Sequence, residues 1–341
     1  MRSLVGSLAA ALVVLTAAPA LAEPVAPAPV AEDARVAGWR DHDLGDPTSG
    51  LRVIRGGTYQ QFQFGAVYSS PAGGTHAVAL DLQEAWGRSG WENGPLGYPV
   101  ADEVELDFGV YQLFQGGSIY MQPGVGAHVV WGAVRDRWAA LGWERGLGYP
   151  LSDEVRLRNG VYQVFQSGSV YWSPSTGAHV VRYAVRDHWA AQGWENGWLG
   201  YPVTDEVPLS DGLYQLFQGG SVYSAPAQGT HAIRGAIRDR WAAQGWENGR
   251  LGWPVTDEVP LRNGAYQMFR TMQSIYWSPE TGAHVVSGPI RNAWGGLGWE
   301  NGRLGYPVGE EVVIAGSRWQ DFAHGRITVE SVSGRVTVTY R

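Results

Sequence analysis

A short amphipathic helix is predicted around Trp138. Val134, Trp138 and Leu141 lie at positions i, i+4 and i+7, and charged residues occupy the opposite face. Gly142 then ends the pattern. Equivalent segments contain Trp86, Trp189, Trp241 and Trp294. Because a helix of about ten residues is marginal on its own, we expect each of these indoles to be buried against a sheet.

Four β-prone runs follow each predicted helix. In one copy they cover residues 154–157, 161–166, 169–172 and 179–181, and tight-turn sequences such as Asn159-Gly160 separate them. Consecutive strands joined by hairpin turns form an antiparallel meander. Each unit is therefore predicted to be one short helix plus one small antiparallel sheet.

The same unit recurs along the chain. The string Leu-Gly-(Tyr/Trp)-Pro has a degenerate copy at 44–47, and its later copies end 51, 52, 52 and 53 residues apart, at Pro99, Pro150, Pro202, Pro254 and Pro307. A regular period of this length is typical of stacked supersecondary units. We predict an α+β repeat domain over 31–341, with six units at about 31–78, 79–130, 131–181, 182–233, 234–286 and 287–341.

Six such units can close into a pseudo-symmetric ring or form an open curved array. Open arrays usually carry polar caps. Here both terminal units keep the aromatic pattern, at residues 59–62 and 319–322. We therefore expect a closed ring.

The N-terminal residues predict export. An apolar run over 4–15 and the small residues before Glu23 are typical of a signal peptide, at 1–22, and a Pro/Ala-rich lead-in follows at 23–30. No later stretch approaches eighteen apolar residues, so we expect a secreted protein with no transmembrane segment after signal cleavage. The chain has no cysteine, which removes disulfides and a lipid-modified cysteine. We expect a non-covalent association with the cell wall or cell surface.

Charge narrows the choice of partners. The net charge is -7 and no basic cluster is present, which argues against nucleic acid because phosphate binding needs concentrated positive charge. We expect a monomer with no cofactor and no metal site.

The repeated residues resemble the LGFP repeat of exported actinobacterial proteins. Besides Leu-Gly-aromatic-Pro, the resemblance includes an Asp-Glu pair, as at Asp153-Glu154, the string Tyr-Gln-x-Phe, as at 162–165, and Gly-(Ala/Thr)-His, as at 177–179. It covers essentially the whole mature chain. It implies a binding module for a mycolic-acid-type envelope, through arabinogalactan or peptidoglycan. Such repeats often follow an enzymatic domain, and this chain departs from that arrangement because no catalytic domain accompanies its repeats.

The loop after each predicted helix is a candidate carbohydrate site. Each loop places an indole beside a carboxylate, in the pairs Trp91 and Glu92, Trp143 and Glu144, Trp194 and Glu195, Trp246 and Glu247, and Trp299 and Glu300. Sugars offer apolar faces to indoles and hydroxyls to carboxylates. The alternative is that each Trp belongs to the core, where aromatic residues of small repeats more often lie.

One histidine recurs at the start of the last strand of each unit. The candidates for ligand contact are His128, His179, His231 and His284, and His76 is their counterpart in the first unit. A structural hydrogen bond to the Asp of the Asp-Glu pair is the simpler interpretation. A metal site is disfavoured because no second His or Cys lies at ligand spacing within a unit.

No arrangement of residues indicates catalysis. The Asp-Glu pairs are adjacent on a strand, so their side chains point to opposite faces. No Gly-x-Ser-x-Gly motif is present. His188 and His324 break the repeat pattern, but neither has a nucleophile at a fixed spacing. We predict a non-catalytic, multivalent polysaccharide-binding protein, with an envelope esterase or hydrolase and a protein-interaction scaffold as alternatives.

Overall fold

Six small sheets and five α-helices make up residues 44–341, the part of the chain that the computed structural model describes. The predicted signal peptide at 1–22 and the lead-in at 23–30 lie outside the described residues. The helices are α1 (Leu80–Arg88), α2 (Gly132–Ala140), α3 (Tyr183–Ala191), α4 (Gly235–Ala242) and α5 (Gly288–Gly296). They contain the five tryptophans around which helices were predicted.

Every sheet is a four-stranded antiparallel meander with its strands in sequence order. The first three sheets are β1 (Arg52–Ile54), β2 (Gly57–Phe62), β3 (Gly65–Ser70), β4 (Gly74–Ala79); β5 (Val104–Leu106), β6 (Gly109–Phe114), β7 (Gly117–Gln122), β8 (Gly126–Trp131); and β9 (Val155–Leu157), β10 (Gly160–Phe165), β11 (Gly168–Ser173), β12 (Gly177–Val181). The last three are β13 (Val207–Leu209), β14 (Gly212–Phe217), β15 (Gly220–Ala225), β16 (Gly229–Ile233); β17 (Val259–Leu261), β18 (Gly264–Met268), β19 (Ser274–Ser278), β20 (Gly282–Val286); and β21 (Val312–Ile314), β22 (Ser317–Phe322), β23 (Gly325–Glu330), β24 (Val336–Tyr340). The predicted unit of one helix and one meander is confirmed.

The hydrophobic cores lie between successive sheets. Around Trp138 of α2, Tyr120 comes from the preceding sheet, Phe165 from the following one, and Leu147 from the loop between them. The Trp138 side chain is fully buried, and its indole N–H donates a hydrogen bond to the carbonyl of Gly148 at 3.1 Å. Each helix and its following loop therefore form a layer between two sheets, and five such layers bury both faces of the sheets between them.

A buried glutamine connects each sheet to its predecessor. Nε2 of Gln215, in β14, donates to the carbonyl of Val180 in β12 at 2.9 Å and to that of Thr204 at 2.7 Å. Gln112, Gln163, Gln267 and Gln320 make the same pair of contacts in the other units. All five side chains are fully buried. This is the Gln of the Tyr-Gln-x-Phe string, so that string holds consecutive units together.

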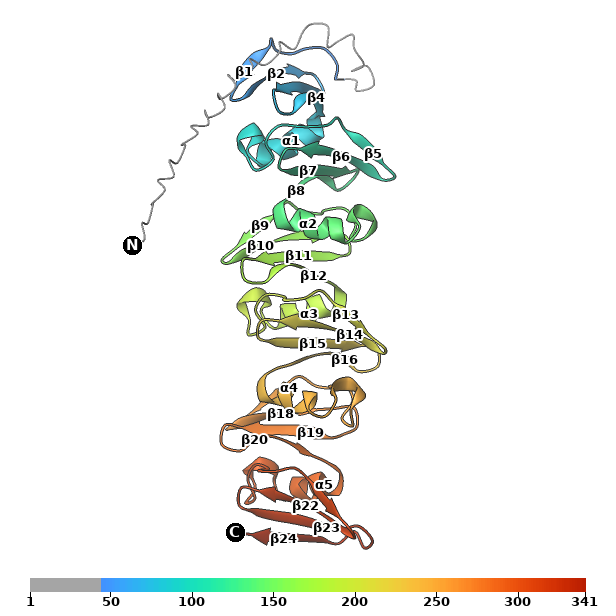
Figure 1. Cartoon of the computed structure of the whole chain (residues 1–341), viewed down its shortest axis with the longest axis vertical. Helices are drawn as coiled ribbons and strands as arrows, with labels where there is room; N and C mark the ends of the chain where they lie inside the picture. Colours follow the sequence, from blue (N-terminus) through green and yellow to red (C-terminus); the bar gives the residue numbers. More distant parts are fainter. Residues whose placement is uncertain (1–43) are drawn as a thin grey trace, which may run out of the picture.

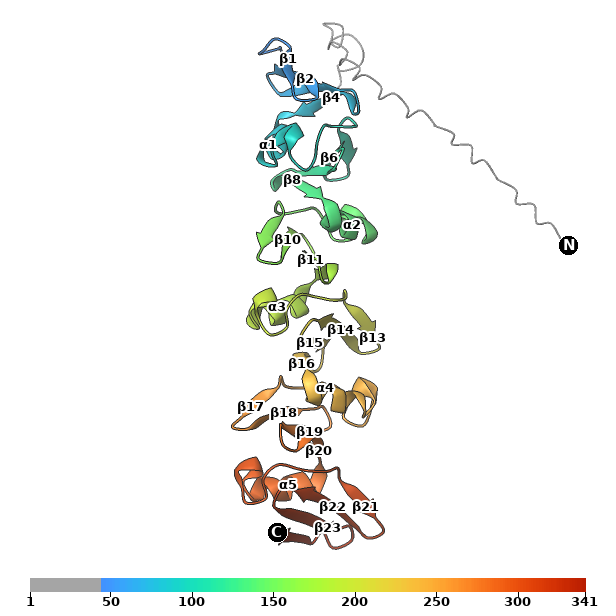
Figure 2. The same cartoon turned by 60° about the vertical axis from the view of Figure 1, so that its left-hand side comes forward.

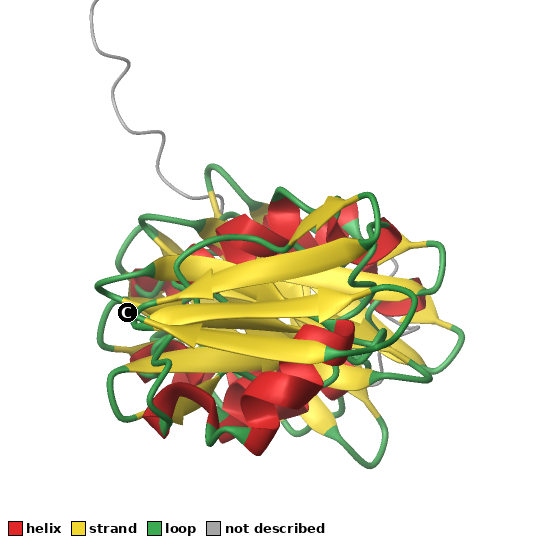
Figure 3. Ribbon diagram, turned by 90° about the horizontal axis from the view of Figure 1, so that it is seen from below, coloured by secondary structure: helices red, strands yellow, loops and turns green. Residues whose placement is uncertain are grey.

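The predicted ring closure is not confirmed. Figure 1 shows an open column in which the six units follow one another along the long axis, with the first and last sheets at opposite ends. In Figure 2 the helices alternate between the two sides of this column, α1, α3 and α5 on one side and α2 and α4 on the other. Viewed along the column, the strands cross the centre and the helices lie toward the periphery (Figure 3).

The last sheet has a polar outer face, which explains why the column can end in solvent. Arg326 makes two hydrogen bonds of 2.8 Å to Asp321, and Arg341 makes a third of 3.0 Å to the same carboxylate. Thr328 of β23 lies opposite Trp319 of β22. The inner units have two tyrosines at these paired positions, such as Tyr171 and Tyr162. A polar terminal repeat is what an open array requires.

None of the helices described between residues 44 and 341 is long and apolar enough to cross a bilayer.

Candidate functional site

The loop after each helix has the same strained backbone. Gly193 follows α3 with a φ of 92°, and Trp194 then adopts a φ of 55° at the start of a single 3₁₀ turn, Trp194–Asn196. Left-handed backbone is uncommon for a bulky residue and costs about 1 kcal/mol or more. Gly197 closes the loop, because a Cβ there would overlap the carbonyl oxygen of Gln192. The same Trp conformation recurs at Trp91, Trp143, Trp246 and Trp299.

Packing against the core holds these loop tryptophans in place. Each loop indole meets the buried helix indole edge-on, with ring centroids 5.3–5.6 Å apart, in the pairs 86/91, 138/143, 189/194, 241/246 and 294/299. An arginine of the helix covers three of them, Arg135 over Trp143, Arg238 over Trp246 and Arg291 over Trp299. Trp91 is 40% exposed, and the other four are half-buried. These indoles therefore serve the core on one face and border the solvent on the other.

The loop carboxylates are oriented by their neighbours. Nδ2 of the following asparagine donates to Oε1 of the glutamate at 2.6–2.8 Å in the pairs 92/93, 195/196, 247/248 and 300/301. Unit three has Arg145 in place of the asparagine, with its Nε 3.8 Å from Oε1 of Glu144. All five glutamates are half-buried.

Pockets lie where these carboxylates meet the sheet that precedes them. One pocket of about 590 Å³ is lined by Asp107 and Phe108 of the β5–β6 turn, by Glu144 and Arg145, and by Tyr149, Gln122 and Gln166. A second, of about 520 Å³, has the matching lining one unit earlier: Arg55 and Gly56, Glu92 and Asn93, Tyr98, Ser70 and Gln115. We call this arrangement the inter-unit pocket. It recurs at successive joints of the column.

Hydrogen bonds fix the wall of the inter-unit pocket. Tyr98 donates its hydroxyl to the carbonyl of Arg55 at 2.7 Å, and Oε1 of Gln115 accepts the backbone N–H of Tyr98 at 3.0 Å. Burial, together with the nearby charge of Glu92, raises the pKa of Tyr98 to about 12. Burial and the matching glutamates raise the pKa of Tyr149, Tyr201 and Tyr306 as well. The phenols stay protonated, and that of Tyr98 donates its hydrogen bond close to the charge of Glu92.

The repeated histidines lie outside this pocket. Nδ1 of His179 is 3.3 Å from Oδ1 of Asp205 in the next unit, and Nε2 donates to the carbonyl of Thr176 at 2.9 Å. The other histidines contact the next carboxylate in the same way, in the pairs His76–Asp102, His128–Asp153, His231–Asp257 and His284–Glu310. The predicted hydrogen bond to the Asp of the Asp-Glu pair is confirmed. In His179, His231 and His284 contacts within the protein occupy both ring nitrogens.

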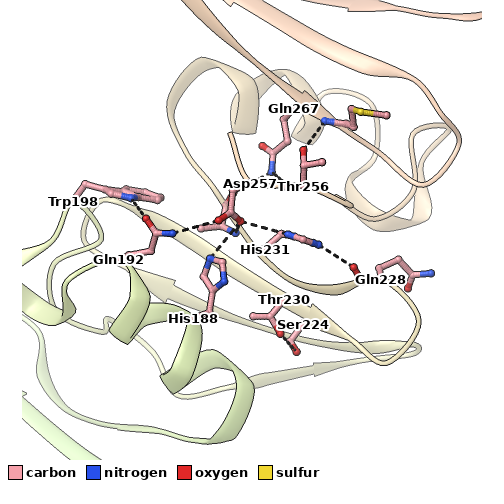
Figure 4. A network of polar contacts seen from close by, with 12 residues as sticks. His188, Gln192, Trp198, Ser224, Gln228, Thr230, His231, Thr256, Asp257 and Gln267 are labelled. Atoms are coloured by element: carbon pink, nitrogen blue, oxygen red, sulfur yellow. Dashed lines mark hydrogen bonds and ion pairs between the residues drawn. The ribbon is translucent and has the colours of Figure 1, made fainter. Parts of the chain in front are cut away.

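Four of these carboxylates also receive a basic side chain from the helix of the preceding unit. Arg88 reaches Asp153 at 3.2 Å, Arg137 pairs with Asp205, and Arg240 reaches Glu310 at 2.7 Å. At the fourth joint the helix residue is His188, whose Nε2 lies 3.3 Å from Oδ1 of Asp257. Figure 4 shows His188 of helix α3 and His231 of strand β16 approaching this carboxylate from two different elements. The pattern-breaking His188 is therefore part of a structural joint.

These contacts govern the ionisation of the joint carboxylates. Burial acts to raise the pKa of Asp257, but hydrogen bonds from His188, His231 and the backbone of Ala232 lower it further, so the net pKa is well below the usual value. The pKa of Asp153 and of Glu310 is lowered by the same balance. Asp153, Asp257 and Glu310 thus remain charged below the pH at which an ordinary carboxyl group is protonated.

Sequence reasoning found the carboxylates of the inter-unit pocket and missed most of its other walls. The Tyr of Leu-Gly-Tyr-Pro, the Gln after Tyr-Gln-x-Phe and the first hairpin turn of each sheet were not identified as lining residues. The recurrence of Gln115, Gln166 and Gln218 just after the Phe was a usable signal, because each accepts a backbone N–H of the Leu-Gly-Tyr-Pro loop. Nothing in the sequence indicated which hairpin turn faces which loop.

Comparison with known proteins identifies the repeat. The LGFP repeat model matches residues 44–94, 96–146, 147–197, 199–249 and 251–302. No curated protein matches this sequence. Among solved structures, the extracellular domain of the putative one component system BT4673 from B. thetaiotaomicron is 9% identical over 86% of this chain and 36% of its own, with a TM-score of 0.14. PorZ of Porphyromonas gingivalis is 10% identical over 87% of this chain and 33% of its own, with the same TM-score. This chain thus spans about a third of the length of both structures.

Proposed function

We propose that this chain, which belongs to the LGFP repeat family, is a secreted, non-catalytic protein that holds a cell-wall polysaccharide through several equivalent pockets at once. The observation that carries the proposal is the recurrence of the inter-unit pocket, with the same carboxylate, phenol and glutamine, at consecutive joints of one column. A ligand with a repeating structure suits a protein whose site repeats.

The chemistry of the inter-unit pocket suits sugar hydroxyls. Glu144 and Glu92 supply charged acceptors, Gln166 and Asn93 supply amides, and Phe108 supplies an exposed apolar ring. A carboxylate makes stronger hydrogen bonds to hydroxyls than a neutral group does. Each pocket is open and shallow for a drug-sized ligand, so we expect weak binding per pocket.

Several weak pockets on one column are sufficient for retention on a polymer. Once one pocket is occupied, the next contact is intramolecular, at an effective concentration of about millimolar for short spans. The expected signal peptide at 1–22 and the absence of cysteine favour a non-covalent hold on the cell wall or cell surface. Arabinogalactan and peptidoglycan are the polymers that we propose as ligands.

The experiment is a pull-down of the pure protein with insoluble arabinogalactan and, separately, peptidoglycan. We compare the wild type with the triple variant Glu144→Gln, Glu195→Gln, Glu247→Gln, which removes the carboxylate of the pocket at Glu144 and the matching loop carboxylates of the next two units at nearly constant shape. We expect the retained fraction to fall at least tenfold. The matched control is Asp136→Asn, Asp187→Asn, Asp239→Asn, which removes three exposed charges from the helices that precede these three loops.

Retention of the triple glutamine variant at the wild-type level contradicts the proposal. Release by a soluble protein extract, with no release by soluble oligosaccharide, points to a protein-interaction scaffold. Turnover of ester or glycoside reporters by the pure protein points to an envelope esterase or hydrolase.

A further inference from the structure

A separate pocket lies at the other end of helix α2 from the inter-unit pocket. It has a volume of about 580 Å³ and lies between the start of α2 and the β9–β10 hairpin of the next sheet. Its apolar lining includes Trp131, Val134 and Trp172, and its charged lining consists of Glu154, Arg156 and Arg158. We call it the Trp131–Trp172 pocket.

The combination of the two tryptophans distinguishes this pocket, because Trp172 has a counterpart in Trp277 but Arg234 takes the place of Trp131 there. Trp131, the last residue of β8, corresponds to Arg182 in the next unit, and Trp172 corresponds to Ser224. Both indoles are half-buried, so part of each ring borders the pocket. Two indoles beside one opening can pack against the apolar face of a bound ring. Little side-chain freedom is lost, because both indoles are already held by the fold.

The charge of the Trp131–Trp172 pocket is opposite to that of the inter-unit pocket. Arg156 and Arg158 are exposed and form no ion pair among residues 44–341 within 4.0 Å. Burial raises the pKa of Glu154, and the charge of Arg156 opposes that shift. The pocket therefore has two guanidinium groups against one partly shielded carboxyl, whereas the inter-unit pocket near it has Glu105, Asp107 and Glu144 against Arg145.

We propose that the Trp131–Trp172 pocket binds a sugar ring that carries one anionic group, with the ring against the indoles and the anion on Arg156 and Arg158. Guanidinium groups bind carboxylate and phosphate through paired hydrogen bonds, which selects for an anionic sugar over a neutral one. This site is separate from the repeated inter-unit pocket, occurs once, and does not depend on the function proposed for that pocket.

The test is isothermal titration calorimetry of the full chain with three probes. Trigalacturonate carries the anion as a carboxylate, glucose 6-phosphate carries it as a phosphate, and maltotriose is neutral. We expect at least one anionic probe to bind and maltotriose not to bind at this site. Raising the salt concentration should weaken the binding, because a charge pair is screened.

We substitute residues of this pocket by the residues found at the same positions of the next unit, which has the same fold. Trp172→Ser and Arg158→Ser reproduce Ser224 and Ser210 of the fourth unit, and we expect each to weaken the anionic probe at least tenfold. Trp277→Ser changes the corresponding indole of the fifth unit and should leave the affinity unchanged. The variant Glu144→Gln, Glu195→Gln, Glu247→Gln should also bind the anionic probe normally. The test of this pocket is therefore separate from the test of the inter-unit pocket.

Two results overturn the proposal. One is that neither anionic probe binds the wild type. The other is that the Trp172→Ser and Arg158→Ser variants bind an anionic probe as tightly as the wild type, with circular dichroism showing that both are folded. Binding of trigalacturonate alone assigns the anion as a carboxylate, and binding of glucose 6-phosphate alone assigns it as a phosphate; both results support the site.

Discussion

The carboxylates at the joints each connect two units of the column. Asp257, in the unit 234–286, accepts the backbone N–H of Ala232 at 2.9 Å and faces His231 and His188, which both belong to the unit before. One acidic side chain therefore ties its own loop to a helix and a strand end of the preceding unit. Ionisation of this side chain affects the stability of the whole joint.

Acid should destabilise the column through these carboxylates. The pKa values of Asp153, Asp257 and Glu310 are lower in the folded state than the usual values of about 4 in the unfolded chain. The unfolded state therefore binds more protons as the pH falls below about 4, and the free energy of unfolding decreases through that range. Urea unfolding at a series of pH values measures it. A free energy that stays level from pH 5 to pH 2.5 would contradict the assignment.

His188 is the one departure from arginine among the helix residues described at these joints. Arg88, Arg137 and Arg240 place a guanidinium, with several N–H donors, beside their carboxylates. We expect His188→Arg to raise the free energy of unfolding by about 0.5–1 kcal/mol, a small gain because Asp257 is one-third exposed and solvent screens the pair. Urea unfolding measures the change, and a free energy that stays equal or falls would count against this role.

At the scale of elements, the buried glutamines connect the sheets. Nε2 of Gln215 donates to two carbonyls that belong to different segments, and the glutamine itself is fully buried. The helix layer supplies apolar contact between sheets, but it does not satisfy these backbone groups. The glutamine therefore fixes the position of one sheet on the next.

Replacing Gln215 with leucine should weaken the contact between the third and fourth sheets. Two carbonyls lose their donor in a buried place, which costs about 2–4 kcal/mol in the free energy of unfolding. Hydrogen exchange should become faster in β12 and β14 first, because repeat proteins lose contacts between neighbouring units locally. Gln228→Leu, in a half-exposed turn, is the control and should change the stability by less than about 0.5 kcal/mol. Equal effects of the two substitutions would refute the role of Gln215.

Sequence reasoning predicted the elements well because their patterns are local. The spacing of Val134, Trp138 and Leu141 was sufficient to place a helix, and turn residues such as Asn159-Gly160 separated the strands. The inter-unit pocket depends on which hairpin turn meets which loop. That contact joins residues about 40 positions apart, such as Tyr98 and Arg55, and no local pattern encodes it.

At the scale of the whole molecule, ring closure was expected because Trp319 and Phe322 keep the aromatic pattern. In a strand, alternate residues face opposite sides. Phe322 faces the inner core, whereas Trp319, Asp321 and Arg326 face outward. The Arg326 guanidinium covers the Trp319 ring, so the retained aromatic pattern did not reveal a polar outer face. The family model likewise ends at residue 302, before the divergent last sheet.

The polar outer face should keep the column from associating end to end. We expect a variant with inner-unit residues, Asp321→Val, Arg326→Ser and Thr328→Tyr, to self-associate, because it exposes an apolar sheet face that the other units cover. Sedimentation equilibrium over a hundredfold concentration range measures this. Glu330→Gln, which leaves the Asp321–Arg326 pair intact, is the control. If the triple variant stays monomeric at every concentration, the cap assignment is wrong.

The alternation of successive units also determines how such a protein meets a polymer. In Figure 2 the β9–β10 and β17–β18 hairpins project to one side, and the β13–β14 and β21–β22 hairpins project to the other. A single glycan strand lying along one side would therefore meet only every second joint of the column. The joints on the opposite side would be free to take a second strand, so one molecule that binds in the proposed way would crosslink neighbouring chains of the cell wall.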